Sequence, residues 1–162
     1  LPYHFNFMGE NQDNYVNASL IRFKDREFIA AQAPVLTFNK YNEVKFDTVS
    51  DFLYLLETGA NTIVTLTMPH EKEHIKCPEW WLEKRRQLKE QCWFEAVKSE
   101  TIFEHSSGQG LIKRTFYFTN HGVKREITQL HFINWLDHDV PHLDVLEELI
   151  KVVVQHNPSG PL

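Results

Sequence analysis

Residues 111–135 read LIKRTFYFTNHGVKREITQLHFINW, and this stretch decides the fold. Residues typical of strands run through LIKRTFYF (111–118) and KREITQLHFINW (124–135), and Asn120-His121-Gly122 separates the two runs. Asn and Gly tolerate the positive φ that tight hairpin turns require. We therefore predict a long antiparallel β-hairpin here.

The segments on either side of this hairpin alternate between expected strands and helices. Before it, residues 93–103 should be extended, and residues 79–91 should be helical in part. After it, residues 135–141 read WLDHDVP and should form a loop, called here the WLDHDVP loop. A final amphipathic helix should then run to about His156, because apolar residues recur at helical spacing at Leu146, Leu149, Ile150 and Val153.

The first third of the chain begins with strand-like segments. NYVNASLI (14–21) and REFIAAQA (26–33) read as short strands joined by a charged turn, and the polar, aromatic-rich residues 35–46 read as a surface excursion. A helix over residues 49–58 and a strand over residues 62–67 should follow.

The helix over residues 49–58 has clear start and stop signals. Thr48-x-x-Asp51 resembles a capping box, and Gly59 supplies a C-terminal stop. Together with the strands, this helix predicts an α/β fold with a twisted mixed β-sheet flanked by helices.

Composition narrows the class of protein. The chain has 162 residues with 42% hydrophobic residues, which suits a single domain with a core, and its net charge of −5 argues against nucleic-acid binding. Cys77 and Cys92 make no disulfide framework and fit a reduced intracellular setting. No apolar stretch reaches transmembrane length. The start, LPYHFNF, has neither an initiator Met nor a signal-peptide pattern, so we expect the chain to be the middle of a longer protein.

One motif suggests a zinc peptidase. Residues 70–74 read HEKEH and satisfy H-E-x-x-H, in which two His on one helix face bind zinc and the Glu acts as general base. Pro69 and Pro78 leave room for at most two helical turns, and the intervening residues offer no apolar face. We therefore expect an exposed charged loop here, and we expect neither a metal nor a cofactor.

Six short motifs occur in an order that resembles the protein tyrosine phosphatase domain. They are NYVNASLI, FIAAQAP, TVSDFLYLL, TIVTLT, KCPEWW and REITQLHFINWLDHDVP. Their family counterparts are D-Y-I-N-A-S, Y-I-A-x-Q-G-P, a D-F-W helix, I-V-M-L-T, K-C-x-x-Y-W-P and Q-F-x-x-x-x-W-P-D-x-G-V-P. The resemblance implies a phosphatase-like α/β domain spanning residues 1–162.

The resemblance also has departures. Leu136 stands where the family has Pro, Asp139 where it has Gly, and residues 39–46 look inserted. The family's phosphotyrosine-recognition loop would precede Leu1, and its H-C-x-x-x-x-x-R catalytic loop would follow Leu162. We therefore expect the chain to be the central part of an incomplete domain and, as given, to be inactive.

The resemblance assigns roles to residues of the WLDHDVP loop. Asp137 would be the general acid that protonates the leaving phenolate and then the base that activates water on a cysteinyl-phosphate. Trp135 and Pro141 would be the hinges of the loop. Asp139, the competing carboxylate, should have a solvated role.

Outside this loop, the resemblance suggests one further site residue. Glu95 is a candidate partner of the catalytic-loop Arg, although an ordinary strand-end carboxylate is nearly as good an interpretation. Cys77 resembles a buried structural cysteine, and Cys92 lacks the H-C-x₅-R frame, so neither is expected to be the nucleophile.

Two function classes follow. The first is a protein tyrosine phosphatase that acts in signalling on phosphotyrosine in a protein substrate. The second is an inactive relative that binds phosphotyrosine or a protein partner; Leu136 and Asp139 favour it slightly, whereas Asp137 favours the enzyme. The expected location is the cytoplasm or the cytoplasmic part of a larger protein, with secretion into a host cell left open. The sequence leaves the substrate protein and the oligomeric state unknown.

Overall fold

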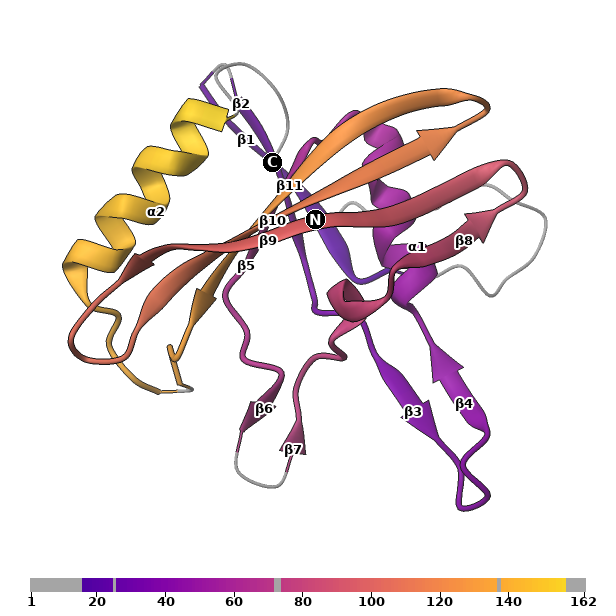
Figure 1. The fold of residues 1–162 in the computed structure, drawn as a ribbon, viewed down its shortest axis with the longest axis horizontal. Coiled ribbons are helices and arrows are strands. Elements are labelled where there is room, and N and C mark those ends of the chain that lie inside the picture. The colour runs from indigo at the N-terminus through magenta and orange to yellow at the C-terminus, as the bar shows by residue number, and fades with distance from the viewer. Residues whose placement is uncertain (1–15, 25, 72–73, 137, 157–162) are drawn as a thin grey trace.

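The computed structural model describes residues 16–24, 26–71, 74–136 and 138–156, and Figure 1 shows it as a curved sheet with α2 at the left and α1 at the right. In chain order the elements are β1 (Ala18–Phe23), β2 (Arg26–Ala31), β3 (Leu36–Phe38), β4 (Val44–Asp47), α1 (Val49–Tyr54), η1 (Leu55–Thr58), β5 (Thr62–Thr65), β6 (His70–Glu71), β7 (His74–Ile75), η2 (Trp80–Leu82), β8 (Arg85–Lys89), β9 (Cys92–Glu104), β10 (Gly110–Asn120), β11 (Val123–Ile133) and α2 (Leu143–His156). Within these described residues, no helix is long and apolar enough to cross a membrane.

The main sheet has five strands in the order β5-β11-β10-β9-β8. The predicted hairpin forms its centre, where β10 and β11 pair antiparallel from Gly110↔Ile133 to Asn120↔Val123. The turn residues His121 and Gly122 both have positive φ, at 45° and 81°. Strand β5 pairs parallel with β11, so the sheet is mixed, as predicted.

The first two strands and the final helix also agree with the sequence-based predictions. Strands β1 and β2 pair antiparallel as a separate hairpin. The expected surface excursion contains a second hairpin, formed by β3 and β4. Helix α2 ends at His156, as its apolar spacing predicts.

The helix predicted over residues 49–58 is correct in extent, and only the predicted capping box at Thr48 is wrong. It is an α-helix only to Tyr54 and continues as a 3₁₀ turn, and Gly59 stops it with φ of 100°. The Thr48 side chain makes no cap, because its Oγ1 accepts a hydrogen bond from the N–H of Val35 (2.9 Å). Oδ1 of Asp47 caps the helix instead, accepting from the N–H of Val49 (2.8 Å).

The prediction of partial helix over residues 79–91 is largely wrong. Only the single 3₁₀ turn η2 is helical, and strand β8 follows and pairs with β9. Trp80 and Trp81 lie in that turn and are both buried. Backbone pairing with the edge of β9 and burial of the two indoles outweigh the helical propensity of the charged residues around them.

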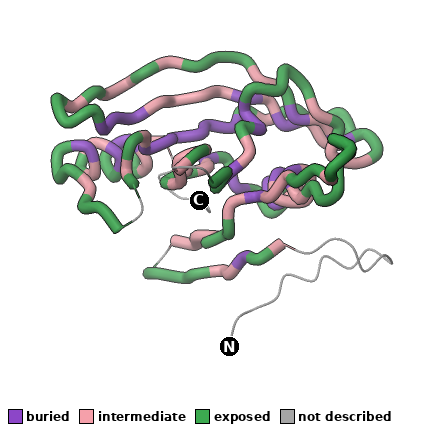
Figure 2. The backbone as a smooth tube through the Cα atoms, turned by 90° about the horizontal axis from the view of Figure 1, so that it is seen from below, coloured by how far each residue is buried: buried purple, intermediate pink, exposed green. Residues whose placement is uncertain are grey.

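Two apolar clusters lie on opposite faces of the sheet. Along β11, Ile127 belongs to the cluster that also contains α1 and η2, whereas Leu130 and Phe132 belong to the cluster under α2. This separation follows from the period of two, which turns successive side chains to opposite faces. Figure 2 shows the buried residues along the central strands and the exposed residues at the outer turns.

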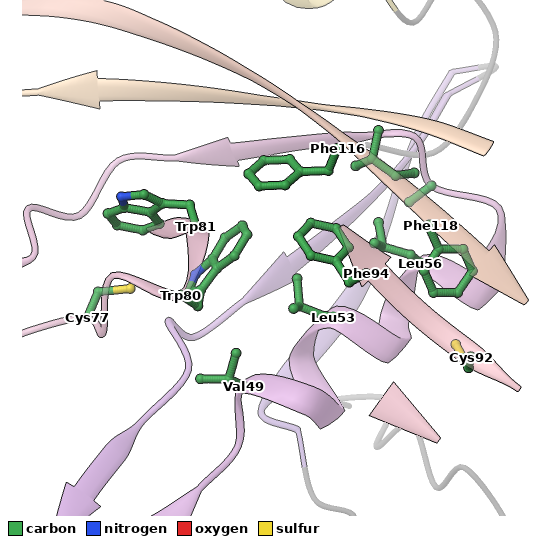
Figure 3. Packing of buried hydrophobic residues seen from close by; sticks show 12 residues of the cluster. Val49, Leu53, Leu56, Cys77, Trp80, Trp81, Cys92, Phe94, Phe116 and Phe118 are labelled. Atoms are coloured by element: carbon green, nitrogen blue, oxygen red, sulfur yellow. The ribbon is translucent and has the colours of Figure 1, made fainter. Parts of the chain in front are cut away.

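Aromatic rings dominate the larger cluster (Figure 3). Phe94 stacks on Phe116 with ring centroids 4.6 Å apart, and Trp80 meets Phe94 edge-on at 5.8 Å. Such pairs add about 0.5–1.5 kcal/mol each to the gain from burying their area. They fix η2, and with it the segment that precedes it, against the sheet.

Candidate functional site

The WLDHDVP loop joins the end of β11 to the start of α2. Asp137, the residue predicted to be the general acid, lies outside the described residues. The described part of the loop includes both predicted hinges, Trp135 and Pro141. Hydrogen bonds hold the described residues on both sides of Asp137.

Trp135 anchors the first half of the loop. Its indole packs on Phe132 with ring centroids 5.3 Å apart, and its Nε1–H donates a hydrogen bond to the backbone oxygen of Asp139 (3.0 Å). The N–H of Asp139 in turn donates to the oxygen of Leu136 (3.1 Å), and His138 adopts a positive φ of 62°. The backbone of Asp139 is thus bonded both to Leu136 and to the Trp135 indole.

The carboxylate of Asp139 has a local structural partner. Its Oδ1 accepts a hydrogen bond from the N–H of Val140 (2.8 Å), and the residue is exposed. A side-chain oxygen bonded to the next backbone N–H shapes a turn. This agrees with the solvated role expected for Asp139.

Both ends of the loop are bonded to the turn between β9 and β10, residues 105–109, called here the β9–β10 turn. Before the loop, Nδ2 of Asn134 donates to the oxygen of Gly108 (2.6 Å). After the loop, Oε1 of Gln109 accepts from the N–H of His142 (2.7 Å), and its Nε2 donates to the oxygen of Val140 (3.5 Å). One turn of the sheet therefore holds the loop at its two ends.

A hollow of about 360 Å³ opens beside the loop. Its lining combines Trp135 and Leu136 of the loop with Glu71 and Lys76 from the segment after β5. Lys76 Nζ lies 3.4 Å from a carboxylate oxygen of Glu71. The hollow thus presents charged side chains of both signs next to the position where the acid is predicted.

Sequence reasoning missed Glu71 and Lys76 as site residues. In the sequence Glu71 stands out only through the HEKEH motif, and Lys76 follows in the same charged stretch. Only the folded chain reveals them, because both line the same hollow as Trp135 and Leu136. The N–H of Asn134, donating to Sδ of Met68 (2.9 Å), joins the two segments directly.

The H-E-x-x-H stretch is not helical. His70 and Glu71 form β6, His74 and Ile75 form β7, and the two strands pair as a short antiparallel hairpin. The geometry that zinc peptidases require, two His one helical turn apart, is therefore missing. The expected loop is in fact this hairpin, which the N–H of Lys76 closes by donating to the oxygen of Pro69 (2.9 Å).

The structure does not bring Glu95 to the WLDHDVP loop. Glu95 is exposed on β9 and lies opposite Tyr117 of β10. The loop leaves the sheet at the other end of β10, where Gly110 pairs with Ile133. The predicted pairing of Glu95 with a catalytic-loop Arg stays a prediction.

Cys77 and Cys92 are buried, and neither is suited to be a nucleophile. Burial raises the pKa of the Cys77 thiol to about 11, and Glu79 adds to the rise. Burial also raises the pKa of Cys92. Attack on phosphorus needs a thiolate, whereas these environments keep both groups protonated at neutral pH.

Comparisons with known proteins agree with this architecture. The chain is 32% identical over 153 residues to human receptor-type tyrosine-protein phosphatase C, covering 87% of the chain and 11% of that protein. It is 28% identical over 161 residues to chicken receptor-type tyrosine-protein phosphatase U, covering 96% of the chain and 10% of that protein. The chain thus spans about a tenth of the length of these curated relatives.

Solved structures share the fold. The catalytic domain of human protein tyrosine phosphatase non-receptor type 18 superposes with a TM-score of 0.70 at 22% identity, over 91% of this chain and 50% of that one. The Trypanosoma cruzi phosphatase TcPTP1 superposes with a TM-score of 0.70 at 20% identity, over 95% of this chain and 53% of that one. A family model described as protein-tyrosine phosphatase matches residues 5–162. The chain therefore belongs to the protein-tyrosine phosphatase family.

Proposed function

We propose that the protein containing this chain hydrolyses phosphotyrosine in proteins through a cysteinyl-phosphate intermediate, with Asp137 as general acid and then general base. The observation that carries the proposal is the WLDHDVP loop, held at both ends by the β9–β10 turn beside a charged hollow. A carboxyl group on a loop held in this way can be delivered repeatedly to the same leaving group.

Lys76 supplies the hollow with a cation for a phosphate-bearing ligand, which would compete with Glu71 for the ammonium group. Lys76 lines the hollow together with the loop residues, and an ammonium group attracts a phosphate dianion. Asp139 is the other carboxylate of the loop, and its bond to the N–H of Val140 supports Asp137 as the acid.

The nucleophile of this mechanism lies outside residues 1–162. The chain has two cysteines, and both sit in environments that raise the thiol pKa. The attacking thiolate, the Arg that holds the phosphoryl oxygens and the phosphotyrosine-recognition loop would come from adjoining sequence. We therefore propose that residues 1–162 form the central part of a phosphatase domain and are inactive alone.

The apolar surface beside β5 supports the proposal that residues 1–162 are only the central part of a domain. A hollow of about 380 Å³ opens between β2, α1 and β5, and its lining includes Phe52, Val64 and Leu66. Val64 and Leu66 are 36% and 43% exposed. Since β5 pairs with β11 on one side alone within the described residues, its other edge can accept a further strand that would bury these side chains.

The second candidate is a phosphatase-like domain that binds phosphotyrosine without turnover. Leu136 in place of Pro and Asp139 in place of Gly favour it, because they change the backbone freedom of the loop that must carry the acid. A solved complex of PTPN18 with HER2 phosphopeptides supports phosphotyrosine peptides as ligands in either case. We propose a cytoplasmic signalling role, in a separate protein or in the cytoplasmic part of a receptor.

Two measurements on the purified protein separate these functions. The first is release of inorganic phosphate from a phosphotyrosyl peptide, with the matched phosphoseryl peptide as control, and the second is binding of the same peptide. Phosphate release together with a phosphocysteine trapped by rapid acid quench supports the enzyme. Binding without release supports the binding module, and the lack of both contradicts the two proposals together.

A further inference from the structure

Three side chains with metal-binding atoms meet between the β9–β10 turn and the start of α2. They are His105 in the turn, His142 just before α2 and Asp144 in its first turn, and their ligand atoms all lie within 4.8 Å of one another. Figure 1 shows this turn beneath the N-terminal end of α2. We propose that His105, His142 and Asp144 bind a divalent first-row transition metal, with Zn²⁺ as the best-fitting ion.

Backbone hydrogen bonds place His105 and His142 next to each other before any metal binds. The N–H of His105 donates to the oxygen of Gln109 (2.9 Å), and the N–H of Gly108 donates to the oxygen of His105 (2.9 Å). The Gln109 side chain accepts from the N–H of His142 (2.7 Å), so the same turn positions both residues. As a result, the two rings lie with centroids 3.6 Å apart.

Ser107 orients the His105 ring. Nδ1 of His105 lies 2.8 Å from Oγ of Ser107 and 3.1 Å from its backbone nitrogen. These contacts engage Nδ1, and Nε2 lies 4.0 Å from Oδ2 of Asp144. In the present structure the N–H of Ser107 donates to Nδ1, so metal binding at Nε2 requires the ring proton to move from Nε2 to Nδ1 and this bond to be exchanged for one from Nδ1–H to Ser107 Oγ.

The donor set selects the class of metal. Two imidazole nitrogens and one carboxylate suit Zn²⁺ and its neighbours, whereas Ca²⁺ and Mg²⁺ prefer oxygen ligands. Tetrahedral Zn²⁺ with bonds of about 2.0–2.1 Å needs ligand atoms about 3.3–3.5 Å apart, with water at the fourth position. The ligand atoms lie within 4.8 Å of one another, so they have to approach by up to about 1.5 Å. The two rings, whose planes differ by 32°, also have to turn so that a nitrogen of each faces the same ion. Rotation of His142 and Asp144, which are both exposed, can supply this contraction.

This metal would act at the end of the WLDHDVP loop. His142 directly follows Pro141, the predicted far hinge, so a bound ion would cross-link the β9–β10 turn to the residue after the hinge. The three metal-binding residues lie outside the hollow that Glu71 and Lys76 line. The metal site therefore does not depend on whether the protein is an active phosphatase. It replaces the sequence-based expectation of no metal, which rested on the HEKEH stretch.

Titration of the chelator-treated protein tests the proposal. We expect one Zn²⁺ per chain at this site by calorimetry, a higher melting temperature with Zn²⁺, and a visible Co²⁺ spectrum without a thiolate charge-transfer band. His142→Ala and Asp144→Asn should each weaken binding about tenfold or more, and Ser107→Ala about tenfold. The control His70→Ala/His74→Ala, in the hairpin of β6 and β7, should bind like the wild type.

Three results would overturn the metal site. They are no binding of Zn²⁺ or Co²⁺, binding unchanged in His142→Ala, and binding lost in the His70→Ala/His74→Ala control. Circular dichroism of each variant shows whether the fold is kept. Because His142 and Asp144 are exposed, we expect an unchanged spectrum.

Discussion

Oε1 of Gln109 accepts a hydrogen bond from the backbone N–H of His142 at 2.7 Å, which joins the β9–β10 turn to the residue after the WLDHDVP loop. Gln109 is buried, with 7% of its surface exposed. Asn134 makes the matching bond before the loop, to the oxygen of Gly108. The position of the loop is therefore set by a sheet turn that lies far from it in sequence.

Replacing Gln109 should loosen this attachment. Gln109→Ala removes the partner of the N–H of His142 and of the oxygen of Val140. Because both residues are exposed and water can replace the side chain, the loss is the net value of a hydrogen bond, about 0.5–1.5 kcal/mol. We expect the free energy of unfolding, measured in urea, to fall by about that amount. Gln87→Ala is the control, because Gln87 is exposed on β8. Equal losses of unfolding free energy in Gln109→Ala and Gln87→Ala would show that the hydrogen bonds of the Gln109 side chain do not stabilise the attachment of the loop.

Acid should destabilise the protein through His131. Burial and, to a smaller extent, the nearby Arg114 guanidinium lower the pKa of His131 to about 4, although the bond to the oxygen of Thr67 opposes the shift. In the unfolded chain the value is about 6.5, so the unfolded state binds more protons below that pH. The stabilisation is complete above about pH 6.5 and is lost toward pH 4, by about 3 kcal/mol in total.

Urea unfolding at a series of pH values checks this expectation. The variant His131→Gln removes the titrating group, and its stability should change less steeply than that of the wild type between pH 6.5 and 4. Parallel curves for the two proteins would contradict the assignment. NMR of the His131 ring would report its midpoint directly.

Cys77 and Cys92 should resist alkylation. Both are buried with raised thiol pKa values, so their thiolate fraction at neutral pH is small. In the native protein we expect iodoacetamide to label a catalytic cysteine from adjoining sequence well before either of these two, as read by peptide mass spectrometry. In urea all should react. Rapid native labelling of Cys77 or Cys92, with loss of activity, would point to a different nucleophile.

Local signals explain which parts of the fold could be predicted. The hairpin around His121 and Gly122 and the helix ending at His156 depend on turn chemistry and on periodicity within one segment. Strand β8 could not be found in this way, because its charged residues become a strand only by pairing with β9. The start of α1 at Val49 is as predicted, but the cap assigned to the Thr48 side chain is wrong because Thr48 bonds to Val35 in another segment.

The same difference, between signals within one segment and contacts between distant segments, decides which residues of the candidate site could be predicted. The WLDHDVP loop was found because its residues are contiguous and follow five other motifs in order. Glu71 and Lys76 were missed because they meet the loop only in the folded chain. His105 and His142 were missed likewise, because the β9–β10 turn and α2 are brought together by packing on the sheet and not by any spacing in the sequence.

The central claim, that Asp137 is the acid of the WLDHDVP loop, is tested most directly by comparing Asp137→Ala with Asp139→Ala in the full-length protein. Phenolate leaves poorly unless it is protonated, so Asp137→Ala should lower kcat for phosphotyrosyl peptides by about 10²–10⁴-fold with KM similar or lower. The loss should shrink for aryl phosphates with an acidic leaving group. Asp139→Ala should change kcat only a few-fold, because the Asp139 carboxylate accepts a hydrogen bond from the N–H of Val140 and so has a structural role in the loop. A crippling Asp139→Ala beside a mild Asp137→Ala, or no effect of either in an active enzyme, would contradict the account.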